Sequence, residues 1–174
     1  MCDIENCRIR NLDRSDLELI LLWRNRPEIR QFMLTQHEIS AEEHLSWFEQ
    51  SSRDQSKKLL IIEEQGNLLG FVQFSGVAVG GVAYWGFYLA PDAKPGSGTK
   101  LGVLSLRYAF EELKLHKICG QALASNEKSI QFHLKLGFTQ EGILRQHCHM
   151  ADSYLDLVEF GLLDSEWLDK ERKK

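Results

Sequence analysis

The sequence contains few of the residues that mark several classes of protein. It has only 3 prolines and 4 cysteines in 174 residues, and 21 lysines and arginines stand against 25 aspartates and glutamates. Its longest apolar stretches, such as Leu19–Trp23 and Leu59–Ile62, are far too short to cross a bilayer. The formal net charge of −4 gives no electrostatic basis for binding nucleic acid or a membrane surface. We therefore expect one soluble domain over residues 1–174, with neither kind of partner.

The cysteines exclude two further classes. Cys2, Cys7, Cys119 and Cys148 match no zinc-ligand spacing, and a chain of this length needs no disulfides to be stable. The acidic start M-C-D-I-E-N-C lacks the apolar core of a signal peptide. We expect reduced thiols in a cytoplasmic protein.

Apolar periodicity predicts seven strands. They are expected at residues 7–12, 59–63, 68–74, 82–89, 117–123, 139–147 and 154–162.

About four helices are predicted between these strands. The first follows a cap at Ser15 or Asp16, and the second follows Ser40, whose S-A-E-E pattern lets Glu43 reach back to the cap. The others cover 99–115 and 129–136, and the last dozen residues read as a polar helix or frayed tail. This order predicts an α/β fold, a mixed sheet with helices on both faces.

A glycine-rich turn joins the predicted strand 82–89 to the helix after it. Gly96 and Gly98 carry no Cβ, so the backbone can approach a phosphate and direct N–H groups at it. The start of the following helix adds a positive end, and Lys94 and Lys100 add charge. On these letters alone, an ordinary surface turn is the alternative.

A second segment, Asn126–Phe138, reads N-E-K-S-I-Q-F-H-L-K-L-G-F, a short helix that ends at Gly137. Together the two segments resemble the cofactor half of the GCN5-related N-acetyltransferases (GNAT). The resemblance covers essentially the whole chain. It implies a single-domain GNAT fold, acetyl-CoA as co-substrate, no metal, and transfer of the acetyl group to an amine.

The resemblance also implies a set of cofactor-binding residues. The strand end accompanies the pantetheine arm, the glycine turn takes the pyrophosphate, and the second segment closes the site. The residues in these three places are Phe87, Tyr88, Leu89, Lys94, Gly96, Ser97, Gly98, Thr99, Asn126, Ser129 and Lys135. The chain departs from the family at Ala93, where Arg or Gln is usual, and at Pro95, which has no N–H to donate. Asn126 has a simpler alternative role as the helix cap.

His133 is the candidate catalytic residue. Seven residues after the asparagine, many relatives carry a tyrosine that protonates the leaving thiolate, and a histidine can do the same work. The alternative is a histidine that only packs in the helix. His147 and His149 share one face of a strand, but no third metal ligand is evident, and the general base is not identified by the sequence.

The N-terminal third carries a more specific resemblance. Its W-R-N…R…M…I-S…H…W-F pattern, with the later S-I-x-F-H-x-K-L-G-F-x-x-E-G-x-L-R-x-H, resembles the N-acetyltransferases of pseudaminic acid biosynthesis. Those enzymes acetylate the 4-amino group of UDP-4-amino-4,6-dideoxy-N-acetyl-β-L-altrosamine. The residues expected at the acceptor are Trp23, Arg24, Asn25, Arg30, Met33, His44, Trp47, Tyr84 and Trp85. Arginines suit the diphosphate and aromatic rings suit the uracil, although the tryptophans could instead be core residues.

Three other functions stay open. Protein N-terminal acetyltransferases of the ribosomal-protein type and polyamine acetyltransferases share the W-R-N opening; the former need an open groove and the latter favour an acidic pocket. A non-catalytic acyl-CoA sensor would bind acetyl-CoA and release no thiol. Fold alone does not decide among them, and a homodimer also stays open.

Overall fold

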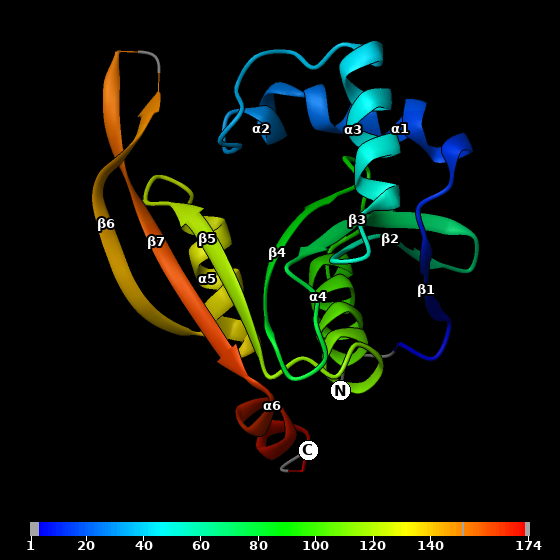
Figure 1. The fold of residues 1–174 in the computed structure, drawn as a ribbon, viewed down its shortest axis with the longest axis vertical. Helices are drawn as coiled ribbons and strands as arrows, with labels where there is room; N and C mark the ends of the chain where they lie inside the picture. Colours follow the sequence, from blue (N-terminus) through cyan, green and yellow to red (C-terminus); the bar gives the residue numbers. More distant parts are fainter. Residues whose placement is uncertain (1–3, 151, 173–174) are drawn as a thin grey trace.

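The computed structural model describes residues 4–150 and 152–172, which form one seven-stranded sheet (Figure 1). The strands are β1 (Cys7–Asn11), β2 (Lys57–Glu64), β3 (Asn67–Ser75), β4 (Val82–Leu89), β5 (Lys117–Leu123), β6 (Thr139–Met150) and β7 (Ser153–Leu163). Their order in the sheet is β1-β2-β3-β4-β5-β7-β6, and only β4 and β5 pair in parallel. The predicted α/β fold with a mixed seven-stranded sheet is confirmed.

The described residues form six α-helices, where the sequence predicted about four. They are α1 (Leu17–Asn25), α2 (Pro27–Arg30), α3 (Ala41–Arg53), α4 (Ser97–Arg107), α5 (Glu127–Leu136) and α6 (Asp164–Arg172). Short turns precede α1 and follow α4, the 3-10 helix η1 (Arg14–Asp16) and the π-helical turn η2 (Tyr108–Glu112). The two additional helices are α2, which begins at Pro27, and α6, which the C-terminal segment forms.

The sheet is buried on both faces around β2. Leu60 and Ile62 belong to the core that holds α4, whereas Leu59 and Ile61 pack in a second core with α1. Because successive side chains of a strand point to opposite faces, a run of four apolar residues supplies both cores. In Figure 1, α1 and α3 accordingly lie on the opposite side of the sheet from α4.

The first helical segment is capped by a residue that the sequence pattern did not indicate. Oδ1 of Asp13 accepts a hydrogen bond from the Ser15 N–H (2.9 Å), and the Asp16 carboxylate accepts one from the Asp13 N–H (2.8 Å). Ser40 does cap α3, since its hydroxyl accepts from the Glu43 N–H at 3.1 Å. The Glu43 carboxylate, however, contacts His37 (3.0 Å) and does not reach back to the cap.

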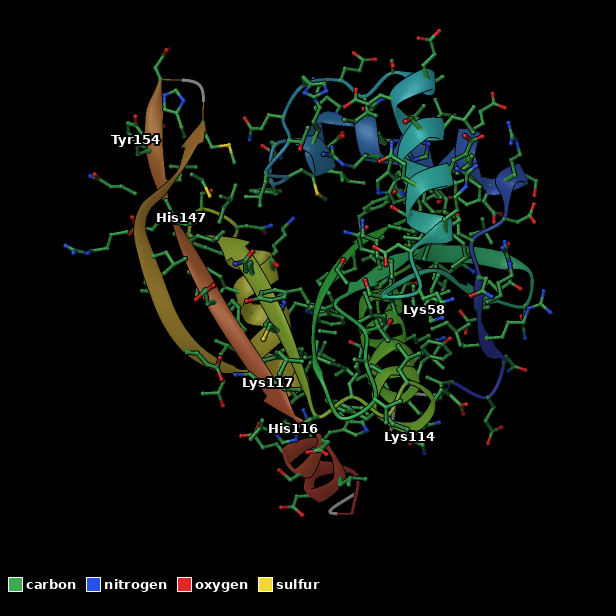
Figure 2. The ribbon with its side chains drawn as sticks, in the orientation of Figure 1. Lys58, Lys114, His116, Lys117, His147 and Tyr154 are labelled. Carbon is green, nitrogen blue, oxygen red and sulfur yellow. The ribbon has the colours of Figure 1, made fainter. Side chains whose placement is uncertain are left out.

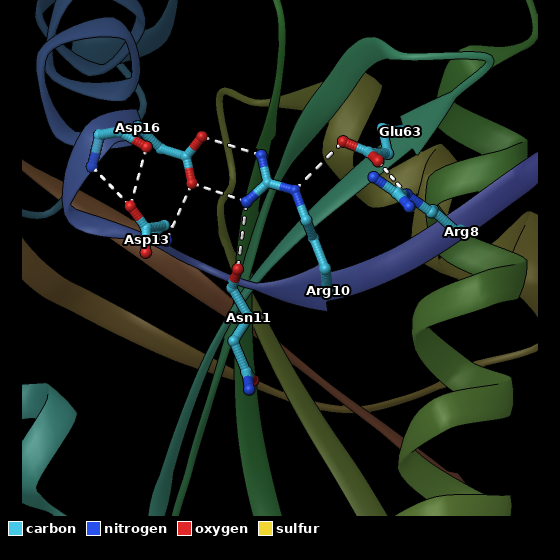
Figure 3. A network of polar contacts seen from close by, with 7 residues as sticks. Arg8, Arg10, Asn11, Asp13, Asp16 and Glu63 are labelled. Carbon is cyan, nitrogen blue, oxygen red and sulfur yellow. Dashed lines mark hydrogen bonds and ion pairs between the residues drawn. The ribbon is translucent and has the colours of Figure 1, made fainter.

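An ion-pair network ties β1 to β2 and to the start of α1 (Figure 3). The guanidinium of Arg10 donates two hydrogen bonds to Asp16 (2.7 and 2.8 Å) and one to Glu63 (3.1 Å), which also pairs with Arg8. The hydrogen bonds from Arg10 hold the pKa of Asp16 below its ordinary value. The network therefore anchors the N-terminal helices to the sheet edge that carries them.

The C-terminal segment is a helix, one of the two forms that the sequence allowed, and it is docked on the core rather than frayed. Trp167 on α6 is 1% exposed and stacks against Phe110 at a ring-centre distance of 6.2 Å. A single tryptophan in a charged stretch gave no periodic signal, so its burial could not be read from the pattern.

None of the helices in the described ranges is long and apolar enough to span a membrane. Cys119 and Cys148 are free thiols, and Cys2 lies outside the described residues.

Candidate active site

The candidate site lies where β4 and β5 part. The two strands pair only from Val82 with Lys117 to Tyr84 with Cys119, while β4 goes on pairing with β3 as far as Leu89. Beyond Tyr84, the edge of β4 that faces β5 is left without a strand partner. A cavity of about 1000 Å³ opens there, walled by β4, β5, α5 and the segment around α2.

The start of α4 offers an anion site at this cavity. Its cap residue Gly96 is left-handed (φ +93°) and has no side chain to bond the first helical N–H groups. A Cβ at Gly98 would make only ordinary contacts, 3.5 Å from Leu89 Cδ1 and 3.7 Å from Phe132 Cε2. The backbone is therefore open to a close ligand, and the uncapped positive end of the helix favours a phosphate.

Six of the expected cofactor residues line this cavity: Phe87, Tyr88, Leu89, Gly98, Asn126 and Ser129. Five others do not: Lys94, Gly96, Ser97, Thr99 and Lys135. Lys135 Nζ lies 3.5 Å from the hydroxyl of Thr99, which links α5 to the first turn of α4. Lys100 pairs with Glu64 on β2, so its charge is partly compensated there.

Asn126 combines the two roles that the sequence allowed. Its side-chain oxygen accepts a hydrogen bond from the Ser129 N–H (3.1 Å) and so caps α5. Its amide nitrogen has no partner among the described residues, and the residue lines the cavity. The cap fixes the side chain while the amide can donate to a carbonyl of the cofactor arm.

Gly98→Val is expected to weaken acetyl-CoA binding by about 10-fold, about 1.4 kcal/mol, because the larger side chain occupies the approach of the pyrophosphate. The variant should fold, since the position has ordinary contacts only. Calorimetric titration with acetyl-CoA measures the change. Gly142→Val is the matched control, because a Cβ at Gly142 meets nothing within 4 Å. Equal affinities for the wild type and the Gly98 variant would place the cofactor elsewhere.

His133 lies at the floor of the same cavity with 1% of its surface exposed. Its Nδ1 lies 2.8 Å from the carbonyl oxygen of Ser129, and its Nε2 lies 3.1 Å from the indole Nε1 of Trp85. Burial lowers the pKa of the imidazole below its ordinary value. Both ring nitrogens thus have protein partners, and the expected role as proton donor stays a prediction that requires one of these bonds to break.

A smaller cavity of about 350 Å³ adjoins the first one. The two share a wall formed by Met33, Leu34, Gln73, Gly86, Phe87 and Tyr88. The smaller one continues under α3, where His44 stacks on Trp47 at a ring-centre distance of 5.0 Å. Arg24 also lines it: Nη2 donates to the carbonyl oxygen of Thr35 (2.7 Å), and the buried Nη1 has no hydrogen-bond partner among the described residues.

The structure brings together only part of the expected acceptor set. Arg24, Met33, His44 and Trp47 line the smaller cavity, and Tyr84 and Trp85 line the larger one. Trp23 packs in the core with α1, which is the alternative that the sequence left open.

Two polar residues of the expected acceptor set are engaged elsewhere. The side-chain amide of Asn25 donates a hydrogen bond to the carbonyl oxygen of Ile39 (2.8 Å) and accepts one from its N–H (2.9 Å). Asn25 therefore holds the loop over the site. Arg30 faces Glu38 at 3.6 Å and lines neither cavity.

Several lining residues carried no sequence signal. Gln73 of β3 belongs to the wall that the two cavities share. Thr35 lines the smaller cavity and lies in a loop without regular structure. Gly120 of β5 lines neither cavity, but an isolated glycine in a strand marks a close approach of neighbouring groups, and this signal could have drawn attention to the position.

The described residues contain no group of three or more His, Cys, Asp or Glu side chains that could hold a metal ion. The rings of His149 and Tyr154 are tilted against each other at a ring-centre distance of 4.8 Å, and Figure 2 shows Tyr154 and His147 on the β6–β7 hairpin.

Comparisons with known proteins agree with this geometry. The family described as acetyltransferase (GNAT) domain matches residues 6–139. Acetyltransferase PseH of Campylobacter jejuni (strain 81-176) is 32% identical over 128 residues, which cover 74% of this chain and 80% of the relative. Spermidine N(1)-acetyltransferase of Escherichia coli K12 is 23% identical over 97% of this chain and 91% of its own.

A solved structure extends the comparison to the whole fold. The spermidine N-acetyltransferase of Vibrio cholerae in complex with CoA and spermine superposes with a TM-score of 0.83 at 26% identity, over 94% of this chain and 98% of that one. With a family match over most of its length and a relative above 30% identity, the chain belongs to the acetyltransferase (GNAT) family and is an N-acetyltransferase.

Proposed function

We propose that the enzyme transfers the acetyl group of acetyl-CoA to the 4-amino group of a UDP-linked amino sugar. The larger cavity takes the cofactor and the reacting amine, and the smaller one takes the nucleotide end of the acceptor. The observation that carries the choice of acceptor is the partnerless Nη1 of Arg24 at the smaller cavity.

A buried guanidinium atom without a partner is costly unless a ligand supplies an acceptor. Burial lowers the pKa of Arg24 from its ordinary value, and the charge of the Glu43 carboxylate, which also contacts His37, does not offset this effect. Phosphate and uracil oxygens are acceptors that suit a planar guanidinium. An anionic, oxygen-rich acceptor therefore fits this cavity better than a polycation.

The aromatic residues around Arg24 suit a flat base. The stacked rings of His44 and Trp47 lie beside Phe71, whose ring centre is 5.9 Å from that of Trp47. Burial, and then the charge of Arg24, lower the pKa of His44, which favours its neutral form. A neutral aromatic wall next to one cation is the arrangement expected for a nucleobase followed by phosphate.

The site's backbone supports the transfer step. The amine nitrogen attacks the thioester carbon, the C–S bond breaks, the nitrogen gives up a proton and the sulfur takes one. The edge of β4 beyond Tyr84 has no strand partner, so its N–H and C=O groups can bond the pantetheine amides and polarise the thioester carbonyl. No metal ion is needed for this chemistry.

Similarity to the PseH acetyltransferases supports the pseudaminic acid pathway and hence a cytoplasmic enzyme. The second candidate is a polyamine acetyltransferase, because the structure with CoA and spermine has the same fold throughout. Two carboxylates in the larger cavity, Glu28 and Glu127, could attract a polyamine. Glu28 already faces Arg26 at 3.5 Å, however, and the buried cation Arg24 repels one.

The test is thiol release from acetyl-CoA with a panel of UDP-4-amino sugars, spermidine, spermine and N-terminal peptides. The proposal expects the highest kcat/KM with a UDP-amino sugar and competitive inhibition by UDP. Highest kcat/KM with spermidine would replace it by the polyamine function. Acetyl-CoA binding without thiol release from any amine would instead indicate a sensor.

A further inference from the structure

The contact between Trp85 and His133 occupies the point where the sheet opens. Tyr84 and Cys119 are the last paired residues of β4 and β5, so Trp85 and Gly120 are the first residues beyond the pairing. Trp85 is 6% exposed and bonds His133 of α5 at 3.1 Å, with the two rings edge to face. The two side chains thus lie at the apex of the cleft in which the acetyl group must react.

Gly120 leaves room for this contact. A Cβ at that position would lie 2.7 Å from Trp85 Nε1 and closer still to His133 Nε2. Real Cβ atoms essentially never approach other atoms so closely, and both neighbours here are atoms of buried rings rather than flexible chain ends. The strand therefore carries glycine where the indole and the imidazole meet.

The two hydrogen bonds determine which ring nitrogen of His133 carries the proton. The Ser129 carbonyl can only accept, so Nδ1 must be the donor to it at 2.8 Å. The Trp85 indole can only donate, so Nε2 must be the acceptor. His133 is held as a neutral imidazole whose Nε2 has a lone pair and no proton.

The surroundings of the imidazole favour that neutral state. The ring stacks on Phe160 of β7 at 4.6 Å and contacts the rings of Phe87, Phe132 and Phe138. Within the described part of the chain, no charged side chain of these elements forms an ion pair or a ring contact with the imidazole, and such an apolar shell opposes the imidazolium.

We propose that Trp85 is a positioning residue for acetyl transfer and that His133 is its hydrogen-bond acceptor, not the donor of a proton to the leaving thiolate. The inference rests on acetyl transfer at this cleft and not on the identity of the acceptor. The bonded rings hold β4 against α5 at the apex, and so fix the strand edge on which the thioester must lie. A misplacement there of about 1 Å can cost on the order of 100-fold in rate.

Three variants of His133 separate positioning from proton donation. In His133→Gln the amide oxygen can replace Nε2 as acceptor for the indole N–H, but the side chain has no proton to give at the working pH. Positioning predicts kcat within about threefold of wild type for His133→Gln and about 100-fold lower for His133→Phe. Proton donation predicts that both are slow, and that His133→Tyr alone recovers rate.

Trp85→Phe supplies the matched test on β4, because it keeps a ring and deletes the N–H. Positioning predicts a fall in kcat like that of His133→Phe, little change in the KM for acetyl-CoA, and a double variant no slower than either single one. In the wild type, nitrogen-15 NMR of the histidine side chains should show Nδ1–H and a bare Nε2 for His133.

The results that would overturn this proposal differ from those that would show that the acceptor is not a UDP-amino sugar. The kinetics use whichever amine of the panel gives thiol release, so a wrong acceptor changes the substrate and not the comparison. A slow His133→Gln that also loses one limb of the kcat–pH profile would establish proton donation. Wild-type kcat in Trp85→Phe, or a protonated Nε2 in the wild type, would remove Trp85 from the mechanism.

Discussion

Arg24→Ala is expected to raise the KM for the UDP-amino sugar by about 10- to 150-fold, the loss of a charge-assisted bond of about 1.5–3 kcal/mol. The KM for acetyl-CoA should change little, because Arg24 lines the smaller cavity and not the larger one. Steady-state kinetics with each substrate varied in turn measures both values.

Two control variants define the role of Arg24. Arg24→Lys keeps the charge but loses the planar pair of donors, so it should recover only part of the affinity. Arg30→Ala should have a smaller effect, because that side chain faces Glu38 at 3.6 Å and lines neither cavity. Equal increases in both KM values for Arg24→Ala would indicate a structural role for Arg24.

Arg24→Ala also distinguishes the two classes of acceptor by the direction in which the KM for the acceptor changes. For a nucleotide sugar, removal of the buried cation weakens binding. For a polyamine, removal of a like charge should strengthen binding, and the KM for spermidine should fall. A fall in the KM for spermidine with no change for the UDP-amino sugar would contradict the proposed function.

The strands could be predicted because their signal is local. The apolar run at 59–62 predicted a strand, and the structure places Leu60 and Ile61 of that strand in two different cores. The glycine turn and the cap at Asn126 also depend on neighbouring residues, and the structure places both at one cavity. The order of these strands and helices along the chain was then sufficient to predict the fold class.

The acceptor-binding residues could not be predicted as well, because tertiary packing decides which of them face the core and which line a cavity. Trp23 and Arg24 are adjacent in the sequence, yet the first is a core residue and the second lines a cavity. Only the direction in which α1 packs decides between them. The roles of Asn25 and Glu43 likewise follow from their contacts with the loop residues Ile39 and His37. No periodicity in the sequence could indicate these contacts.

The role of His133 depends on partners far away in the sequence. Its position after Asn126 indicates a place near the thiolate, but the state of its ring follows from Trp85, which is 48 residues away on another element. A histidine with one donor and one acceptor bond is a neutral ring of fixed orientation, whereas a solvent-facing one could ionise. The residue type alone does not distinguish the two.

Gly120→Ala should therefore lower the rate strongly, because it displaces the side chains of Trp85 and His133. The new methyl group meets the rings of Trp85 and His133 at the apex of the cleft, and neither ring can move without displacing a packed neighbour. We expect kcat to fall by about 100-fold, the cost of misplacing the reacting groups by roughly 1 Å. Overpacking should also lower the free energy of unfolding by about 1–3 kcal/mol.

Gly142→Ala is the control for Gly120→Ala, since it adds the same methyl group on β6 where nothing lies within 4 Å. Denaturant unfolding and kcat are measured for both variants at a temperature where each remains folded. The Gly120 variant should be slow while folded, with its acetyl-CoA affinity largely kept, because the nearest atoms to the new methyl group belong to His133 and Trp85 and not to the anion site at α4 or to Asn126. A folded Gly120→Ala enzyme with wild-type kcat would show that the Trp85–His133 contact can yield without cost, and that the opening of β4 and β5 is maintained by other residues.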